Sequence, residues 1–220
     1  PKVWSHTMKT NDLIAMLAAE ASATPTVSPL RRCAQAIAAG MAVSLVLVLT
    51  LWGLNPELNA LARTQAFWVK VVWLVLTCLF AAPVVMHLSR PGIAAGRGVW
   101  GIAAALLGMV MLALAQVATV DADTGIQLML GRSWQICSAS IAALSVPLLA
   151  TLLWMLRDMA PTRPALAGAS AGLMAGSLAS LVYSLHCTET AYAFVAVWYV
   201  AGIAVMTGVG ALLGTRILRW

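Results

Sequence analysis

The sequence predicts an all-α, polytopic integral membrane protein with six transmembrane helices and both termini in the cytoplasm. The 220-residue chain is 62% hydrophobic and only 9% charged, more apolar surface than a soluble domain could bury. Six apolar stretches each approach the roughly 20 residues that a helix needs to cross a bilayer. The arginines between these stretches fall on alternate sides of the predicted membrane.

The six stretches are continuous rather than alternating in hydropathy, which favours helices over the strands of a barrel. We expect the spans at about residues 32–54, 66–88, 97–118, 133–156, 164–185 and 192–215. No segment outside them is long enough to bury a core of its own. Residues 32–220 are therefore predicted to form one six-helix transmembrane domain in a lipid bilayer.

The positions of the arginines predict the orientation. The net charge is +6. Arginines gather in the N-terminal tail, the second and fourth loops and the C-terminus, at Arg31, Arg32, Arg90, Arg97, Arg157, Arg163, Arg216 and Arg219. Positively charged loops stay in the cytoplasm, so both termini are expected inside. Because topology explains the charge, we predict no direct contact with nucleic acid.

The N-terminal residues are expected to form a tail with a short helix. Residues 1–7 read poorly as a natural start and are interpreted as an expression scar, so that residues 8–31 form the cytoplasmic tail. Asp12, Leu13, Ile14 and Leu17 are assigned to an amphipathic helix, with the three apolar side chains on one face.

The small, polar and proline-bearing stretch at residues 21–29 predicts a flexible linker after this helix. A helix this short is marginal alone in water, so we expect its apolar face to bind a partner. The alternative is a helix that lies on the membrane surface. The lack of Lys and Arg on its polar face argues against that alternative.

Small residues recur at four-residue spacing in the fifth span, at Gly168, Gly172, Gly176 and Ser180. Such a row lets two helix backbones approach closely. We expect it to serve packing within the bundle rather than a dimer interface.

Ionisable groups are scarce inside the predicted membrane. Lys70 lies a few residues inside the second span, and its stem is long enough to reach back to the interface. Transporters normally keep ionisable groups at mid-membrane, so their scarcity argues against transport. The chain shows no carboxylate pair, no nucleophile with a base and no nucleotide-binding loop, and we predict that it is not an enzyme.

The four cysteines fall into two kinds. Cys33 and Cys78 are interpreted as small buried apolar residues. Cys137 lies near the outer end of the fourth span, and Cys187 lies in the short loop before the sixth. The predicted topology places both on the extracytoplasmic side.

Several interpretations of this second pair stay open. On an oxidising face, Cys137 and Cys187 could form a disulfide. With His186 and Glu189 they could instead hold a metal ion, the one cofactor that the sequence suggests. They could also be two unrelated interfacial residues. A thiol oxidoreductase usually carries a Cys-x-x-Cys motif, which this chain lacks.

Short motifs spread from Met8 to Trp220 together suggest a family. They are Met8-Lys9-Thr10-Asn11-Asp12-Leu13-Ile14, Phe67-Trp68-Val69-Lys70, Arg90-Pro91-Gly92, Arg157 with Ala160-Pro161-Thr162-Arg163-Pro164, Leu185-His186-Cys187, Phe194-Val195-Ala196-Val197-Trp198-Tyr199 and Arg216-Ile217-Leu218-Arg219-Trp220. This joint pattern resembles the NrsF family. Its members are six-helix bacterial inner-membrane proteins, found with extracytoplasmic-function sigma factors, that act as anti-sigma factors.

The resemblance implies a function that composition alone does not. The cytoplasmic N-terminal segment, with Asp12, Leu13, Ile14 and Leu17, would hold an extracytoplasmic-function sigma factor at the inner membrane. Two family cysteines, matching Cys137 and Cys187, would sense a stress on the outer side. A small-molecule transporter and a membrane thiol oxidoreductase remain the alternative functions.

Overall fold

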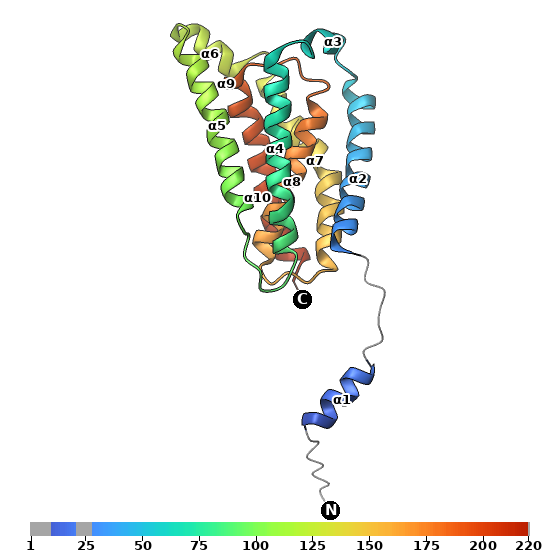
Figure 1. The fold of residues 1–220 in the computed structure, drawn as a ribbon. Helices are drawn as coiled ribbons and strands as arrows, with labels where there is room; N and C mark the ends of the chain where they lie inside the picture. The colour runs from blue at the N-terminus through green and yellow to red at the C-terminus, as the bar shows by residue number, and fades with distance from the viewer. Residues whose placement is uncertain (1–9, 21–27, 220) are drawn as a thin grey trace, which may run out of the picture.

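The computed structural model describes residues 10–20 and 28–219, and its regular structure in those ranges is helical. The segment interpreted as an expression scar, residues 1–7, lies outside them. Six of the described helices are long and apolar enough to cross a membrane, by length and composition. They run up and down in one bundle (Figure 1). The prediction of six spans is therefore confirmed at the level of length and hydropathy.

The six spans agree with the expected ranges to within a few residues. They are α2 (Pro29–Leu47, continued by a π-helical turn at Val48–Trp52), α4 (Gln65–Leu88), α5 (Gly98–Ala118), α7 (Trp134–Arg157), α8 (Pro164–Tyr183) and α10 (Val200–Ile217, preceded by α9, Tyr192–Phe194, and a second π-helical turn, Val195–Tyr199). Two short helices, α3 (Leu58–Leu61) and α6 (Ala122–Leu130), connect spans. We did not predict α6 or the π-helical turns.

The bundle has two ends. We call the end nearer the chain termini the proximal end and the opposite end the distal end. At the proximal end lie the start of α2 and the C-terminal end of α10, and at the distal end lie α3 and α6 (Figure 1). Because the spans alternate in direction, every arginine-bearing connection predicted as cytoplasmic lies at the proximal end.

Local sequence sets where the spans begin. The Ser28 hydroxyl oxygen accepts a hydrogen bond from the Arg31 backbone N–H at 3.3 Å, and Pro29 occupies the first helical position. The Thr64 hydroxyl oxygen accepts from the Phe67 N–H at 3.4 Å at the start of α4. Each cap satisfies a backbone donor that the first helical turn leaves free.

The glycine row of α8 packs against α10, as predicted. A side chain at Gly172 would collide with the Met206 carbonyl oxygen, and one at Gly168 with the Gly210 carbonyl oxygen. The two backbones are therefore in direct contact, which only glycine permits. This contact lies inside the bundle and makes α8, the most buried of the six spans, its central helix.

Small and polar residues also join the outer spans to the centre. The Ser44 hydroxyl of α2 donates to the Leu144 carbonyl oxygen of α7 at 2.8 Å. One turn earlier, a side chain at Gly40 would lie 2.8 Å from the Leu148 Cα, so these helices also approach closely.

Helix α1 (Thr10–Glu20) forms where the sequence predicts a helix in the tail and stands apart from the bundle (Figure 1). The side chains of Asp12 and Ile14 are exposed, with Ile14 58% exposed. The side chains of Leu13 and Leu17, the other members of the predicted binding face, lie outside the described part of the structure.

Candidate functional site

The loop that follows α8, residues 184–191, joins the distal ends of several spans. The Leu185 carbonyl oxygen accepts a hydrogen bond from the Asn55 N–H at 3.1 Å. A carboxylate oxygen of Glu189 accepts from the Arg132 N–H at 2.8 Å. The loop is thereby fixed to the α2–α3 connection on one side and to the α6–α7 connection on the other.

The two predicted sensor cysteines meet in this region. Cys137 lies in the first turn of α7 and is fully buried, while Cys187 lies in the loop and is 3% exposed. Their side chains lie next to each other, and both are free thiols. The structure therefore brings together two residues that are far apart in the sequence. Their role as a sensor stays a prediction.

Lys70 is fully buried beside the two cysteines. Its Nζ donates to the Glu189 backbone carbonyl oxygen at 2.8 Å. It also lies 5.5 Å from the centre of the Tyr199 ring and 5.7 Å from that of Phe67. The stem of Lys70 therefore extends to the loop at its own end of the bundle, as expected, but its amino group is shielded from solvent there. The carbonyl oxygen and the aromatic faces supply the polar surroundings that water would otherwise give.

The surroundings of Cys187 lower the pKa of its thiol. A hydrogen bond from the Cys137 thiol lowers the pKa of Cys187, and the nearby Lys70 and the Tyr199 hydroxyl lower it further. Burial acts in the opposite direction, but it is the smaller effect next to the bond from Cys137. A lowered pKa increases the thiolate fraction of Cys187, the form in which a thiol is nucleophilic.

His186, the third residue of the predicted metal site, lies beside Cys187 in the same loop. Its Nδ1 lies 3.1 Å from the Gly53 carbonyl oxygen. Because a carbonyl oxygen can only accept, this hydrogen bond requires Nδ1 to be the donor. Within the described residues, no three His, Cys, Asp or Glu side chains are grouped so that they could hold a metal ion. The disulfide and the metal site at Cys137, His186 and Cys187 both stay predictions.

A cavity of about 350 Å³ opens beside Cys187 at the distal end. Asn55, Ser133 and His186 line it with Cys187, whereas Cys137 and Lys70 are not among its lining residues. Sequence reasoning missed Asn55 and the complete burial of Lys70. A lysine inside an apolar span was a usable signal, because such a residue is costly there unless it has a partner.

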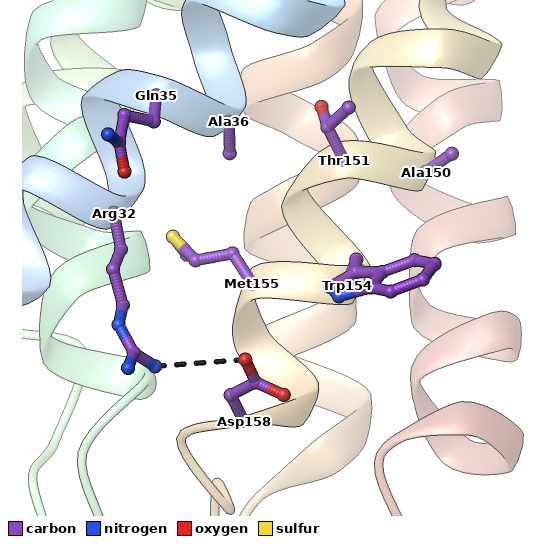
Figure 2. Close-up of a pocket in the computed structure, with 8 residues that line it drawn as sticks. All are labelled: Arg32, Gln35, Ala36, Ala150, Thr151, Trp154, Met155 and Asp158. Atoms are coloured by element: carbon purple, nitrogen blue, oxygen red, sulfur yellow. Dashed lines mark ion pairs between the residues drawn. The ribbon is translucent and has the colours of Figure 1, made fainter.

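The proximal end carries a different kind of site. A cavity of about 450 Å³ lies between α2 and α7, with the Met155 side chain pointing into the gap (Figure 2). Arg32 of α2 reaches Asp158, just past the end of α7, at 3.7 Å (Figure 2). Both side chains are largely exposed, so this ion pair contributes little to stability.

Known proteins resemble this chain over almost its whole length. The family model described as NrsF, negative regulator of sigma F, matches residues 17–220. A probable anti-sigma-F factor NrsF from Azospira oryzae is 40% identical over 215 residues, which cover 97% of this chain and all of that protein. The anti-sigma-F factor NrsF of Caulobacter vibrioides is 38% identical with the same coverage.

No solved structure matches the chain. The family assignment therefore depends on sequence, and it confirms the resemblance inferred from the short motifs. With a family model that spans the bundle and two relatives matched over their full length, the chain belongs to the NrsF family of negative regulators of sigma F.

Proposed function

We propose that this chain is an anti-sigma factor of the bacterial inner membrane. It holds an extracytoplasmic-function sigma factor through its cytoplasmic N-terminal segment and releases the factor when a stress acts on Cys137 and Cys187. The relatives named as anti-sigma-F factors support the regulatory role, which is not that of an enzyme.

One observation supports this proposal most directly. The cysteine pair lies at the distal end of the bundle, and the tail joins the proximal end at Pro29. A span of 20 residues such as α8 separates the two ends by about 30 Å. A reaction of the cysteine pair would therefore take place about one membrane thickness away from the tail that binds the partner.

The arginines supply the orientation. They gather at the proximal end, which is the cytoplasmic side if positive connections stay inside. The distal end then faces an oxidising compartment, where a cysteine pair can be oxidised. Reporter fusions at residues 60 and 125 should appear outside, and those at residues 93 and 160 inside. The reverse pattern would contradict the proposal.

The packing offers a path between the two ends. Cys137 belongs to α7, and Cys187 follows α8, which packs against α10 through its glycine row. A bond between the two thiols would constrain α7 against α8. A sensor requires two such states with different affinities for the partner.

The tail is tested by capture of the sigma factor on the intact protein and on a variant without residues 8–28. Leu13→Asp with Leu17→Asp should abolish capture, because an amphipathic helix binds through apolar anchors at this spacing. Ala15→Asp with Ala19→Asp is the matched control, with the same charge and spacing on the other side of α1. If the Leu13/Leu17 variant still captures the sigma factor, the contact must lie elsewhere, in the arginine-bearing loops.

The cysteines are tested by stress-induced release of the sigma factor. Cys137→Ser and Cys187→Ser should alter the response equally, and the double variant should add nothing, because the two act as one unit. Cys33→Ser and Cys78→Ser are the matched controls, since both residues are buried elsewhere in the bundle. Additive effects would mean that the two thiols act separately. A transporter or a thiol oxidoreductase would need neither the tail nor a bound sigma factor.

A further inference from the structure

Helices α7 and α10 are in contact near the distal end of the bundle and separate toward the proximal end. The Ser138 hydroxyl of α7 donates to the carbonyl oxygen of Trp198, in the turn before α10, at 2.8 Å. One turn further along α10, a side chain at Gly202 would lie 3.0 Å from Cγ2 of Ile141. Closer to the proximal end, the same two helices leave a groove of about 560 Å³ between them.

The groove opens because α10 presents its glycines to α8. A side chain at Gly210 would collide with the Gly168 carbonyl oxygen, and one at Gly214 with the Pro164 carbonyl oxygen. The face of α10 that permits close approach is therefore occupied by α8. Larger side chains of α10, such as Val209, line the groove on the side of α7.

The walls of the groove are long and apolar. Its lining residues extend along α7 from Ala142 to Arg157 and along α10 from Val205 to Ile217. At 1.5 Å of rise per residue, these walls are about 18–22 Å long. Half of a bilayer's hydrocarbon core is about 15 Å thick. The groove can therefore hold one acyl chain of a single leaflet along its whole length.

The proximal mouth of the groove carries a positive charge. Arg157, in the last turn of α7, is the only charged residue among those that line the groove in the described structure. Its side chain is exposed, and no carboxylate of the described residues pairs with it. The neighbouring Asp158 pairs with Arg32 of α2 instead (Figure 2). The mouth thus offers a cation without an acidic partner.

Trp154 indicates the depth at which this mouth lies in a bilayer. Its side chain points away from α2 (Figure 2), is 78% exposed and lines both the groove and the cavity beside α2. Tryptophan rings gather at the membrane–water interface, where an apolar ring and an indole N–H are both accommodated. Arg157, less than one turn further along α7, is then at the level of the lipid headgroups.

We propose that the groove between α7 and α10 binds an anionic phospholipid, with its phosphate against Arg157 and one acyl chain between the two helices. A chain without a charged headgroup would suit the walls but would leave Arg157 unpaired. A zwitterionic phospholipid brings a cation as well, and Asp158 already pairs with Arg32. The inference goes beyond the proposed function and does not rest on it, because it requires only that the six spans lie in a bilayer.

Native mass spectrometry of the purified full-length chain, freed of lipid in a neutral detergent, tests the headgroup. Phosphatidylglycerol and phosphatidylcholine with the same acyl chains are the probes, and the unaltered chain should bind phosphatidylglycerol more tightly. Arg157→Gln should weaken phosphatidylglycerol binding about fivefold, the contribution of one arginine near anionic headgroups. Arg90→Gln is the matched control, since it removes the same charge from an exposed connection at the same end and should change nothing.

A second substitution tests the acyl chain. Ala150 is exposed and lines the groove on α7, so Ala150→Phe should weaken the binding of both lipids at least about threefold by filling the space of the chain. Ala204→Phe is its control, because Ala204 is exposed on α10 but does not line the groove.

Three results would overturn the proposal. Equal affinity of the unaltered chain for the two lipids, or equal effects of Arg157→Gln and Arg90→Gln, would mean a general attraction of the basic surface. Unchanged binding in Ala150→Phe would place the lipid outside the groove. The two substitutions act on different parts of the groove, so if one variant failed to fold, the other would decide. No sigma factor enters the assay, so failure here would leave the anti-sigma proposal intact.

Discussion

The two ends of the bundle use polar residues in opposite ways. At the distal end, Lys70 is fully buried, and its one amino group binds a particular carbonyl oxygen. At the proximal end, the side chains of Arg32 and Asp158 are 40% and 56% exposed and pair at 3.7 Å. A buried polar group depends on its partner, whereas an exposed charge can be replaced by water at little cost. The distal end is therefore specific in its chemistry, and the proximal end is tolerant of substitution.

The largest difference between the ends should come from Lys70→Met. The change keeps the length of the side chain but leaves the half-buried Glu189 carbonyl oxygen without its donor. We expect the free energy of unfolding in detergent to fall by about 1–3 kcal/mol. Iodoacetamide should also alkylate Cys187 more slowly, because a nearby positive charge is lost. Unchanged stability together with an unchanged alkylation rate would show that the lysine is not bound as described.

A smaller effect is expected from Arg32→Gln at the proximal end. The ion pair with Asp158 is mostly solvated, so its loss should change the free energy of unfolding by no more than about 0.5 kcal/mol. Thermal unfolding at low and at high salt would check this, since screening should remove even that difference. If Arg32→Gln lowered the free energy of unfolding as much as Lys70→Met does, the two ends would not differ in how strongly they depend on their polar pairs.

The smallest effect concerns Asp121, the N-cap of α6 at the distal end. Hydrogen bonds from the Thr124 backbone N–H and hydroxyl lower the pKa of its carboxyl group. The capping contribution is therefore fully present above the ordinary carboxyl pKa and is lost as the pH falls through the lowered one. The Thr124 amide resonance should report this acid transition by NMR. Asp121→Asn should keep the cap and abolish the transition.

The span count and the meeting of the cysteines could be predicted because they follow from local properties. Run length and hydropathy define the spans, and alternation then places the start of α7 and the end of α8 at one end. The inward direction of Lys70 could not be predicted in the same way. Helix α4 is apolar on all sides, so its sequence does not show which face meets the other helices.

Other features of the site depend on contacts between distant segments. Asn55 belongs to the site because its N–H binds Leu185, a residue from another connection. The π-helical turn Val195–Tyr199, which ends at the tyrosine beside Cys187, has no signal in the apolar sequence around it. The tail forms a helix where the sequence predicts one. Its apolar face stays a predicted binding surface, because the side chains of Leu13 and Leu17 lie outside the described part of the structure.

The glycine contact between α8 and α10 has a mechanical consequence. Where the two backbones touch, at the glycine positions, no side chains lie between them to slide or repack, so the pair should move as one stiff unit. A rod about 30 Å long that tilts by about 4° moves its far end by about 2 Å. If the rod pivots near the thiols, a small tilt imposed there would produce a larger displacement at the proximal end of the bundle.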